Sequence, residues 1–503
     1  MPTADQTRTP LLDAVLNYAE SEVTRFHMPG HKGGRAVNDR LLQALGPKTW
    51  AMDATGVLGL DDLHQPGGVI QEAQELAAAA FGADHTFFLV NGTSAGVQAM
   101  ILSACAPGDK IIIGRNLHKS AQAGLVLSGA QPVYIQPEVD PELGIGLGLA
   151  PASVADAIRR HPDAAAVLVV SPTYHGIASD LAAIAGLTHK AGMLLLVDEA
   201  HGAHFRFHSA LPRPGALEAG ADMAAHGIHK VLGGLTQASM LHVKGGRVDL
   251  ARVRRVLQAL QSTSASYLLL ASLDAARRDA ALQGERLLSG PLEWARLLRR
   301  GVAGLAPLRT FGRELVGRPG CAGLDELKVN VDVTGLGLTG QEAEVLLRRR
   351  YGIQAEMSDL AGVLFMLGPG SGRKDVEVLL GALEDLVQTT PGTDLRPGAR
   401  AVLPPPPPPP LPPSEITPRE AFFRPSEAVP LDEAEDRIAA ELVTCYPPGI
   451  PLIGPGERVT AQVLEQMRLV AEGRLRVSGP ADGSLATLRV LKEGARHGRA
   501  SGP

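Results

Sequence analysis

An aspartate and a lysine, about thirty residues apart, are the two side chains whose setting best suits them to chemistry. Asp198 follows an apolar run, residues 193–197, that has the composition of a buried strand. Its carboxylate is therefore expected at the carboxyl end of that strand, where ligands bind in open α/β sheets. Lys230 follows His226 and His229 and precedes a short glycine-bearing turn. Neighbouring positive charge and partial burial would lower the pKa of its amine, and a lysine is nucleophilic only when unprotonated.

This arrangement of Asp198 and Lys230 is the one that a pyridoxal phosphate enzyme needs. The carboxylate keeps the pyridinium nitrogen of the cofactor protonated, so that the ring can accept electrons, and the lysine holds the aldehyde as a Schiff base. A lone lysine after a strand is usually a surface residue. The strand that ends at Asp198 is what favours the reactive interpretation.

A third stretch could bind the phosphate of such a cofactor. Residues 86–90 have the pattern of a short strand, and NGTSAG follows as a glycine-bearing turn that opens a helix. Backbone N–H groups at a helix N-terminus attract phosphate, and Thr93 and Ser94 would add hydroxyl donors. A Thr or Ser at this point is more often only a helix cap. Its position ahead of the aspartate and the lysine supports the cofactor site.

Composition indicates a globular chain of two or three domains that acts on small molecules. The 503 residues are 45% hydrophobic, and the net charge of −5 gives no general attraction to nucleic acid or to anionic membranes. The three cysteines are widely spaced and form no CxxC pair, so neither a disulfide framework nor a zinc site is predicted, and no metal is expected. The N-terminus lacks an apolar signal core, and no apolar run is long enough to span a bilayer. We expect a cytoplasmic protein with no membrane or nucleic-acid partner.

Strands alternate with helices through residues 82–245, which predicts a mostly parallel sheet with helices on both faces. The clearest strands are residues 110–114, 133–135 and 166–170, and residues 11–24 and 70–81 have helical spacing. Further along, the pattern predicts a strand at 327–333, a helix at 341–350, a strand–turn–strand unit at 351–368 and a helix at 431–443.

These patterns divide the chain into five parts. The predicted parts are an N-terminal segment and loop (1–52), a cofactor-binding large domain (53–300), a small domain (301–390), a proline-rich linker (391–413) and a C-terminal domain (414–503). The linker contains seven consecutive prolines, Pro404–Pro410, which favour an extended polyproline II conformation. It is interpreted as a spacer, with an SH3-type ligand as the alternative.

Eight motifs, in a fixed order, resemble those of one enzyme family. They are FHMPGHKGG, DLHQPGG, NGTSAG, RNLHKS, SPTYHG, DEAHGAH, IHKVLGGLTQASMLHVKG and CYPPGIPLIGPGE. Together they are similar to the ornithine/lysine/arginine decarboxylases, which are fold type I pyridoxal phosphate enzymes, and the likeness runs from about residue 11 to 470. It implies an α/β fold with an aspartate aminotransferase-like large domain, a small α+β domain and a C-terminal α+β domain.

The resemblance also implies a role for each matching residue. Lys230 would be the catalytic Schiff-base lysine, Asp198 the partner of the pyridinium nitrogen and His118 a catalytic imidazole stacked on the cofactor ring. On spacing alone, a histidine such as His118 is more often structural. The remaining cofactor-binding positions would be Thr93, Ser94, the backbone of Ala95, His201 near the ring plane and His229 beside the phosphate.

Two departures from the family pattern, and the candidate substrate residue, complete the predicted site. Gly227 replaces the serine often found three residues before the lysine, and Ala265 replaces a usual proline. Ser264 and its two neighbours persist and could contact the phosphate of a neighbouring subunit. Glu441, just ahead of the CYPPGIP motif, is the candidate for binding the distal cation of a basic substrate. Glu356 and Asp359 either face the active site or are solvated loop carboxylates.

The resemblance implies decarboxylation of a basic amino acid, and we expect L-arginine to be converted to agmatine and CO2 as a step of polyamine biosynthesis. Short members of the family commonly use arginine, and FHMPGHK comes early in this chain. Its early position also predicts a homodimer or tetramer with shared active sites. Lysine and ornithine remain alternative substrates, as do another fold type I activity, such as an aminotransferase or a β-eliminating lyase, and a cofactor-binding but inactive regulator.

A helicase is excluded, although residues 198–201 spell DEAH. Such an ATP site needs a GxxxxGK[ST] phosphate loop, and the sequence contains no Gly-Lys dipeptide.

Overall fold

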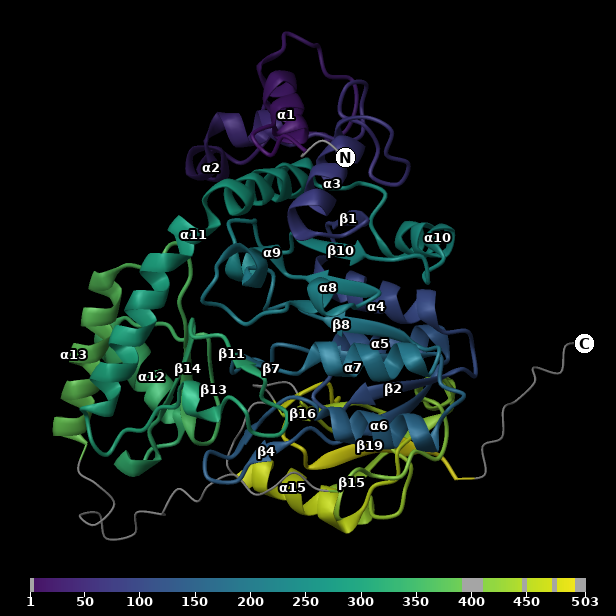
Figure 1. Ribbon diagram of the computed structural model, residues 1–503, viewed down its shortest axis with the longest axis vertical. Coiled ribbons are helices and arrows are strands. Elements are labelled where there is room, and N and C mark those ends of the chain that lie inside the picture. Colours follow the sequence, from purple (N-terminus) through teal and green to yellow (C-terminus); the bar gives the residue numbers. More distant parts are fainter. Residues whose placement is uncertain (1–3, 391–409, 446–449, 473–476, 494–503) are drawn as a thin grey trace, which may run out of the picture. The chain divides into compact units, whose positions relative to one another are not determined.

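The computed structural model describes residues 4–390, 410–445, 450–472 and 477–493 (Figure 1). Residues 391–409 of the predicted linker, including the proline run, and residues 446–449 of the CYPPGIP motif lie outside these ranges. The chain forms two compact units, the first from residues 1–104 and 194–289, the second from 105–193 and 290–503. In the described ranges, every helix is too short or too polar to span a bilayer.

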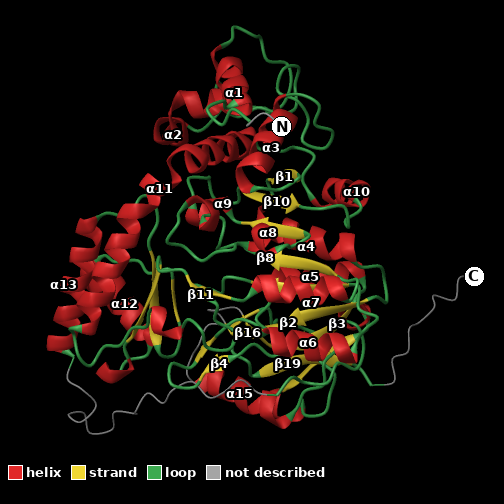
Figure 2. Cartoon of the chain, in the orientation of Figure 1, coloured by secondary structure: helices red, strands yellow, loops and turns green. Residues whose placement is uncertain are grey.

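The first unit contains four neighbouring strands and helices from both of its chain segments (Figure 2). Its strands are β1 (His85–Leu89), β8 (Leu194–Asp198), β9 (Met223–His226) and β10 (Ser239–Val243). Its helices are α1 (Pro10–Glu20), α2 (Asp39–Met52), α3 (Val69–Phe81), α4 (Gly92–Ala104), α8 (Ala216–Ala219), α9 (Ile228–Val231), α10 (Leu250–Leu260) and the 3-10 turn η1 (Phe205–Phe207). Helix α11 (Tyr267–Ala303) begins in this unit and continues into the second.

The strand order in this unit, β1-β10-β9-β8, brings two strand ends together at the site. β8 and β9 run parallel, with Asp198 opposite Ala225, whereas β10 pairs antiparallel with both β9 and β1. Helix α4 packs against β9 and β10, and α10 packs against α4. Because β8 and β9 are parallel, the loops after Asp198 and after His226 leave the sheet at the same edge.

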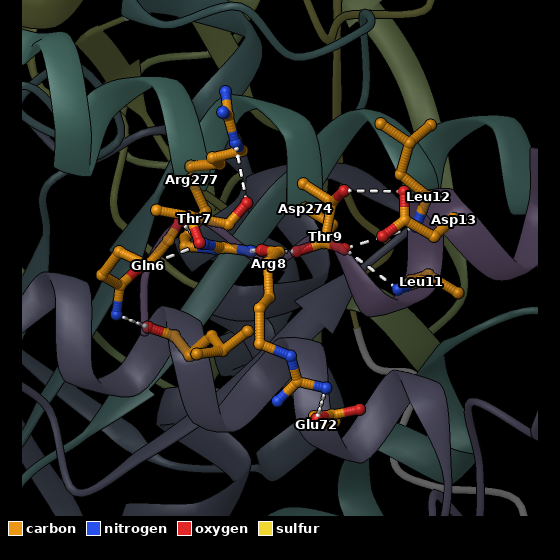
Figure 3. A network of polar contacts seen from close by, with 12 residues as sticks. Gln6, Thr7, Arg8, Thr9, Leu11, Leu12, Asp13, Glu72, Asp274 and Arg277 are labelled. Carbon is orange, nitrogen blue, oxygen red and sulfur yellow. Dashed lines mark hydrogen bonds and ion pairs between the residues drawn. The ribbon is translucent and has the colours of Figure 1, made fainter. Parts of the chain in front are cut away.

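The N-terminal segment of the first unit is tied to α11 by a buried ion pair (Figure 3). The side chains of Asp274 and Arg277 are fully buried, and Nη1 of Arg277 donates to the carbonyl of Gln6 at 2.8 Å. Oδ2 of Asp274 accepts the backbone N–H groups of Leu11 and Leu12 at 3.0 and 3.3 Å. These N–H groups lie in the first turn of α1, where no intrahelical acceptor exists, so a residue from another helix caps α1.

The second unit begins with three neighbouring parallel strands in the order β6-β2-β3. The elements of its first segment are β2 (Lys110–Gly114), α5 (Lys119–Ser128), β3 (Gln131–Ile135), β4 (Val139–Asp140), β5 (Ile145–Gly146), α6 (Pro151–Arg160), β6 (Ala166–Val170), β7 (Ile177–Ala178) and α7 (Leu181–Lys190). The strands predicted at 110–114 and 166–170 are confirmed.

The second segment adds an antiparallel sheet, β12-β14-β13, and a region of two small antiparallel sheets, β15-β19 and β17-β16-β18. The elements around the first sheet are η2 (Arg313–Leu315), β11 (Gly323–Leu324), β12 (Lys328–Asp332), η3 (Thr334–Leu336), α12 (Gly340–Tyr351), β13 (Met357–Ser358), β14 (Gly362–Met366) and α13 (Arg373–Thr389). Those of the last region are α14 (Pro418–Phe423), β15 (Ser426–Pro430), η5 (Leu431–Glu433), β16 (Val443–Cys445), β17 (Ile450–Ile453), α15 (Ala461–Glu472), β18 (Val477–Ser478) and β19 (Thr487–Leu491).

The prediction of a helix at residues 431–443 is wrong. Only η5 is helical, the backbone of Asp436 is left-handed with φ of 60°, and Val443 already belongs to β16. Ile438 and Ala439 form isolated bridges to Arg458 and Val490. Leu431, Ala434, Ala439 and Val443 of the segment are buried in a core shared with α15 and β19, so tertiary pairing overrides the weak helical preference of the segment.

Candidate active site

Lys230 lies on a four-residue helix, α9, that begins directly after β9 and Gly227. Gly227 N–H donates to the carbonyl of Ala200 at 3.2 Å, and the N–H of Lys230 donates to the carbonyl of Gly227 at 3.1 Å. The turn is tight, because a Cβ added at Gly227 would lie 2.7 Å from the Ala200 oxygen, closer than real Cβ atoms approach such groups. The glycine therefore allows the lysine turn to pack against the loop after β8.

The amine of Lys230 is directed toward His201. Nζ of Lys230 lies 2.9 Å from Nε2 of His201, a histidine that is 6% exposed and that stands in the loop after β8. A protonated lysine donates in this contact, which requires an unprotonated Nε2 and places the ring proton of a neutral His201 on Nδ1. The amine of Lys230 and the loop after β8 thus meet in the first unit.

Asp198 ends β8 and is 5% exposed. Among the described residues its carboxylate has one hydrogen bond, which Oδ1 accepts from the N–H of Ala200 at 3.2 Å. The second oxygen, Oδ2, is left available to accept from a ligand. A buried carboxylate with one uncommitted oxygen has the chemistry needed to bind a protonated ring nitrogen.

Thr93 stands in the first turn of α4, next to the lysine turn. Its hydroxyl lies 2.8 Å from that of Ser239, and a Cβ at Gly227 would come within 3.2 Å of Thr93 Oγ1. Ser94 is half-buried in the same turn, and Ala95 is buried. Helix α4 therefore directs its N-terminus, with a hydroxyl pair, toward the residues that precede Lys230, as a phosphate site requires.

Ser239 is a site residue that the sequence analysis did not assign. The antiparallel pairing of β1 with β10 places it opposite Leu89, just ahead of the NGTSAG turn. It stands in the hydroxyl-bearing stretch after Gly234, but only the register of β10 against β1 shows that it meets Thr93. That register was not available from the sequence.

The two histidines before Lys230 have different surroundings. Nδ1 of His229 donates to the carbonyl of Ala238 at 3.0 Å, and burial, together with the charge of Lys230, lowers the pKa of His229 below its ordinary value. His226 is buried, and its Nε2 lies 2.7 Å from Oε2 of Glu199. Neither contact reaches the phosphate position, so the phosphate role of His229 stays a prediction.

His118 belongs to the second unit and begins α5 there. Its Nδ1 accepts from the N–H of Ser120 at 3.2 Å and lies 2.8 Å from the hydroxyl of Ser120. A nitrogen that accepts a backbone N–H carries no proton of its own, so a neutral His118 has its proton on Nε2. The ring is therefore held with an N–H group at its outer end, and its stacking role stays a prediction.

Two further predicted site residues have local contacts of their own. Ser264 in the first unit is exposed, and its N–H donates to Ser262 Oγ at 3.2 Å. Glu441 in the second unit accepts the backbone N–H groups of Ala481 and Arg489 through its two oxygens, both at 2.7 Å. The predicted roles of Ser264 toward a neighbouring subunit and of Glu441 toward a substrate cation stay predictions.

The residues gathered in the first unit fit pyridoxal phosphate. They supply an amine at Lys230, a buried carboxylate oxygen at Asp198, and a hydroxyl pair at the start of α4. The absence of a side chain at Gly227 is what lets these groups approach one another. An amine for the aldehyde, an acceptor for the ring nitrogen and donors for the phosphate are the three groups that the cofactor requires.

Comparison with known proteins identifies the class and then the family. Among solved structures, a lysine decarboxylase of Francisella novicida aligns with a TM-score of 0.83 over 96% of this chain and 81% of that chain, at 20% identity. Such a likeness shows the fold, and the α/β fold type I prediction is confirmed. Residues 9–325 match the major domain of the Orn/Lys/Arg decarboxylases and residues 409–479 match their C-terminal domain. The chain belongs to the Orn/Lys/Arg decarboxylase family.

Two curated relatives match nearly the full length. The arginine decarboxylase of Bacillus anthracis is 42% identical over 488 residues, which cover 97% of this chain and 98% of that protein. The arginine decarboxylase of Bacillus subtilis is also 42% identical over 488 residues, covering 97% of this chain and 99% of that protein. The sequence-based assignment to this family is confirmed, and the protein is a decarboxylase.

Proposed function

We propose that the protein is a pyridoxal phosphate-dependent decarboxylase that converts L-arginine to agmatine and CO2. The choice of substrate rests on one observation, the identity of 42% over 97% of the chain to arginine decarboxylases. The chemistry is supported by the contact between the amine of Lys230 and His201, next to the strand that ends at Asp198.

When it is bound, pyridoxal phosphate supplies an electron sink for the pair of electrons that remains after CO2 is lost. Asp198 would maintain that sink, because its uncommitted Oδ2 would accept the N–H of the ring nitrogen and keep it protonated. Lys230 would supply the amine that holds the aldehyde carbon, and Thr93 and Ser94 would donate to the phosphate from the first turn of α4.

Two groups are suited to return a proton to the α-carbon of the substrate. Lys230 would carry the proton at Nζ and exchange it with Nε2 of His201, 2.9 Å away. His118 can donate from Nε2–H, because Ser120 occupies its Nδ1. Reprotonation at the carbon that lost CO2 completes the amine product.

The alternative proposal is a lysine or ornithine decarboxylase with the same residues in the same roles. Glu441 remains the candidate for the distal cation of any of these substrates. We further propose a homodimer or tetramer, in which Ser264 reaches the phosphate of a neighbouring subunit, located in the cytoplasm and serving polyamine biosynthesis.

The deciding experiment is a competition among substrates. The purified protein with added pyridoxal phosphate is incubated with equal amounts of arginine, lysine and ornithine, and the amines formed are identified by mass spectrometry. We expect mainly agmatine, and a Lys230→Ala variant is expected to form essentially none, because it lacks the amine that attaches the cofactor.

Each other result has a definite meaning. Mainly cadaverine or putrescine would move the substrate to lysine or ornithine and keep the mechanism. No amine from a protein that is yellow with bound cofactor would reject the decarboxylase proposal and favour another fold type I activity.

A further inference from the structure

A buried ion pair in the second unit joins the end of strand β2 to the last loop of the IPLIGPGE motif. Arg115 directly follows β2 and is 4% exposed, and Glu457 is 1% exposed. Two guanidinium nitrogens donate to the two carboxylate oxygens, Nη2 to Oε2 at 2.8 Å and Nη1 to Oε1. The contact is bidentate, the geometry that fixes both side chains most firmly.

The same two side chains also hold the backbone of the loop. Arg115 donates through Nε to the carbonyl of Pro451 at 3.1 Å and through Nη2 to that of Leu452 at 3.2 Å. Glu457 Oε2 accepts the N–H of Gly454 at 2.6 Å. Residues 451–457 are thus bound by Arg115 at three points, two carbonyls and one carboxylate.

The side chain of Tyr134 covers the ion pair on one side. The guanidinium of Arg115 lies 4.7 Å from the ring centre of Tyr134, whose hydroxyl donates to Gln122 Oε1 at 3.1 Å. Although burial alone would lower the pKa of Arg115, the Glu457 carboxylate raises it above the ordinary value. The guanidinium of Arg115 is therefore charged, and the pair is enclosed and tied to β3 and α5.

Arg115 also begins the turn that carries His118. The turn runs from Arg115, whose N–H donates to the carbonyl of Ile135 at 2.8 Å, to Ser120, which binds Nδ1 of His118. Asn116, inside the turn, has a buried side chain without a hydrogen bond among the described residues. Side-chain anchoring of this turn therefore comes from Arg115 at its start and from Ser120 at its end.

The cost of burying two charges points to a role in positioning. Removing an arginine and a carboxylate from water is expensive, and well-packed apolar residues of similar size often give equal or greater stability. A bidentate pair with three further hydrogen bonds to the backbone fixes the orientation of both side chains, which apolar residues cannot do. The turn that carries His118 begins at Arg115, three residues earlier, so the orientation of this turn is what the pair fixes.

We propose that Arg115 and Glu457 are positioning residues for His118, so that the loop of residues 451–457 sets the orientation of the imidazole. The inference rests on the proposed function, in which His118 faces the cofactor ring. Loss of the pair leaves His118 in place chemically but lets the turn shift, and a misplacement of about 1 Å can cost about a hundredfold in rate.

The test is a double-mutant cycle on the holoenzyme with Glu457→Gln and His118→Ala. Glu457→Gln keeps the size of the side chain and removes its charge. We expect kcat of the folded protein to fall about tenfold to a hundredfold, with KM and cofactor content little changed and the visible circular dichroism of the bound cofactor altered; the thermal midpoint is expected to fall as well, because Arg115 keeps an unpaired buried charge. Adding Glu457→Gln to His118→Ala is expected to cause little further loss, because both variants act through one side chain.

Asp140→Asn is the matched control. Asp140 is 1% exposed, pairs with Arg318 in the same unit, and accepts the backbone N–H groups of Glu142 and Leu143, away from the 115–120 turn in sequence. Any effect of Asp140→Asn on kcat is expected to multiply with the effect of His118→Ala. If Glu457→Gln yields no folded protein, Arg115→Lys, which keeps the charge but loses the fork of donors, is used in its place.

If the double variant lost kcat by the product of the Glu457→Gln and His118→Ala effects, the positioning proposal would be overturned. A Glu457→Gln variant with normal kcat and an unchanged dichroism spectrum would overturn it as well. If His118→Ala alone leaves kcat unchanged, the role of His118 in the proposed function fails instead, so the two failures are distinguishable.

Discussion

Two buried arginine–carboxylate pairs, one in each unit, have similar chemistry and different surroundings. Arg277 and Asp274 are fully buried on α11 and bind the backbone of residues 6–12 (Figure 3). Arg115 and Glu457 bind residues 451–457 and the turn that carries His118. The first pair anchors a chain segment and caps α1, whereas the second adjoins a predicted catalytic residue. We infer that the first pair serves stability and the second serves geometry.

The largest expected effect is on stability, from Asp274→Ala. The substitution leaves the buried guanidinium of Arg277 without its partner and the first turn of α1 without its cap, and breaking such a pair costs about 3–5 kcal/mol. The free energy of unfolding, measured by chemical denaturation at one protein concentration, should fall by that amount, and the N-terminal segment should become more sensitive to protease. The kcat of the folded fraction should be unchanged. A large fall in kcat without a fall in stability would contradict the assignment of this pair to stability.

Apolar replacement of both partners should separate the two pairs. Arg115→Met with Glu457→Leu removes two buried charges together, so the thermal midpoint should change little, while kcat should fall about tenfold to a hundredfold because His118 is less well oriented. Arg277→Met with Asp274→Leu should recover most of the stability lost in Asp274→Ala, short by about 1 kcal/mol for the missing cap, with normal kcat. If the two double variants had equal kcat, the assignment of one pair to stability and of the other to geometry would be wrong.

Sequence reasoning found the chemistry of the site because motifs keep reactive residues next to strand ends. Asp198 ends β8, as the apolar run 193–197 predicted, and Lys230 stands on α9 directly after β9. Contacts between distant segments were not visible in the same way. That Ser239 meets Thr93 depends on the register of β10 against β1, and that Glu457 pairs with Arg115 depends on packing across more than three hundred residues.

Local patterns also mislead where tertiary pairing decides the backbone. Residues 431–443 have helical spacing, yet Ile438 and Ala439 pair with residues far along the chain. For Glu441 the sequence suggested a partner for the distal cation of the substrate, and only the structure shows that both of its oxygens accept backbone N–H groups of Ala481 and Arg489. The roles of individual site residues stay predictions, since they depend on a bound cofactor and on neighbouring subunits. The predicted domain boundaries also stay predictions.

The smallest expected effect is on the pH dependence of stability, and it concerns two carboxylates that cap helices. Asp61 caps α3 much as Asp274 caps α1, because its Oδ2 accepts the N–H groups of Gly68 and Ile70 at 2.8 and 3.0 Å. Burial raises the pKa of Asp274 more than the bonds from Arg277 lower it. Burial alone would also raise the pKa of Asp61, but the backbone N–H groups of Gly67, Asp62 and Gly68 lower it below the ordinary value.

The two carboxylates should therefore give opposite pH dependence. With Asp274, the unfolded chain loses its proton first as pH rises, so the free energy of unfolding falls from the ordinary pKa up to the raised folded pKa. With Asp61, the folded chain loses its proton first, so the stabilisation is present above the ordinary pKa and is lost as pH falls through the lowered folded pKa. Denaturation of the wild type, Asp274→Asn and Asp61→Asn from about pH 3 to 7 measures both. The advantage of wild type over Asp274→Asn should shrink as pH rises, and its advantage over Asp61→Asn should grow. If the advantage of the wild type over both variants changed with pH in the same direction, burial would not distinguish the two capping carboxylates. The ion pair with Arg277 would then have to hold Asp274 ionised at little cost.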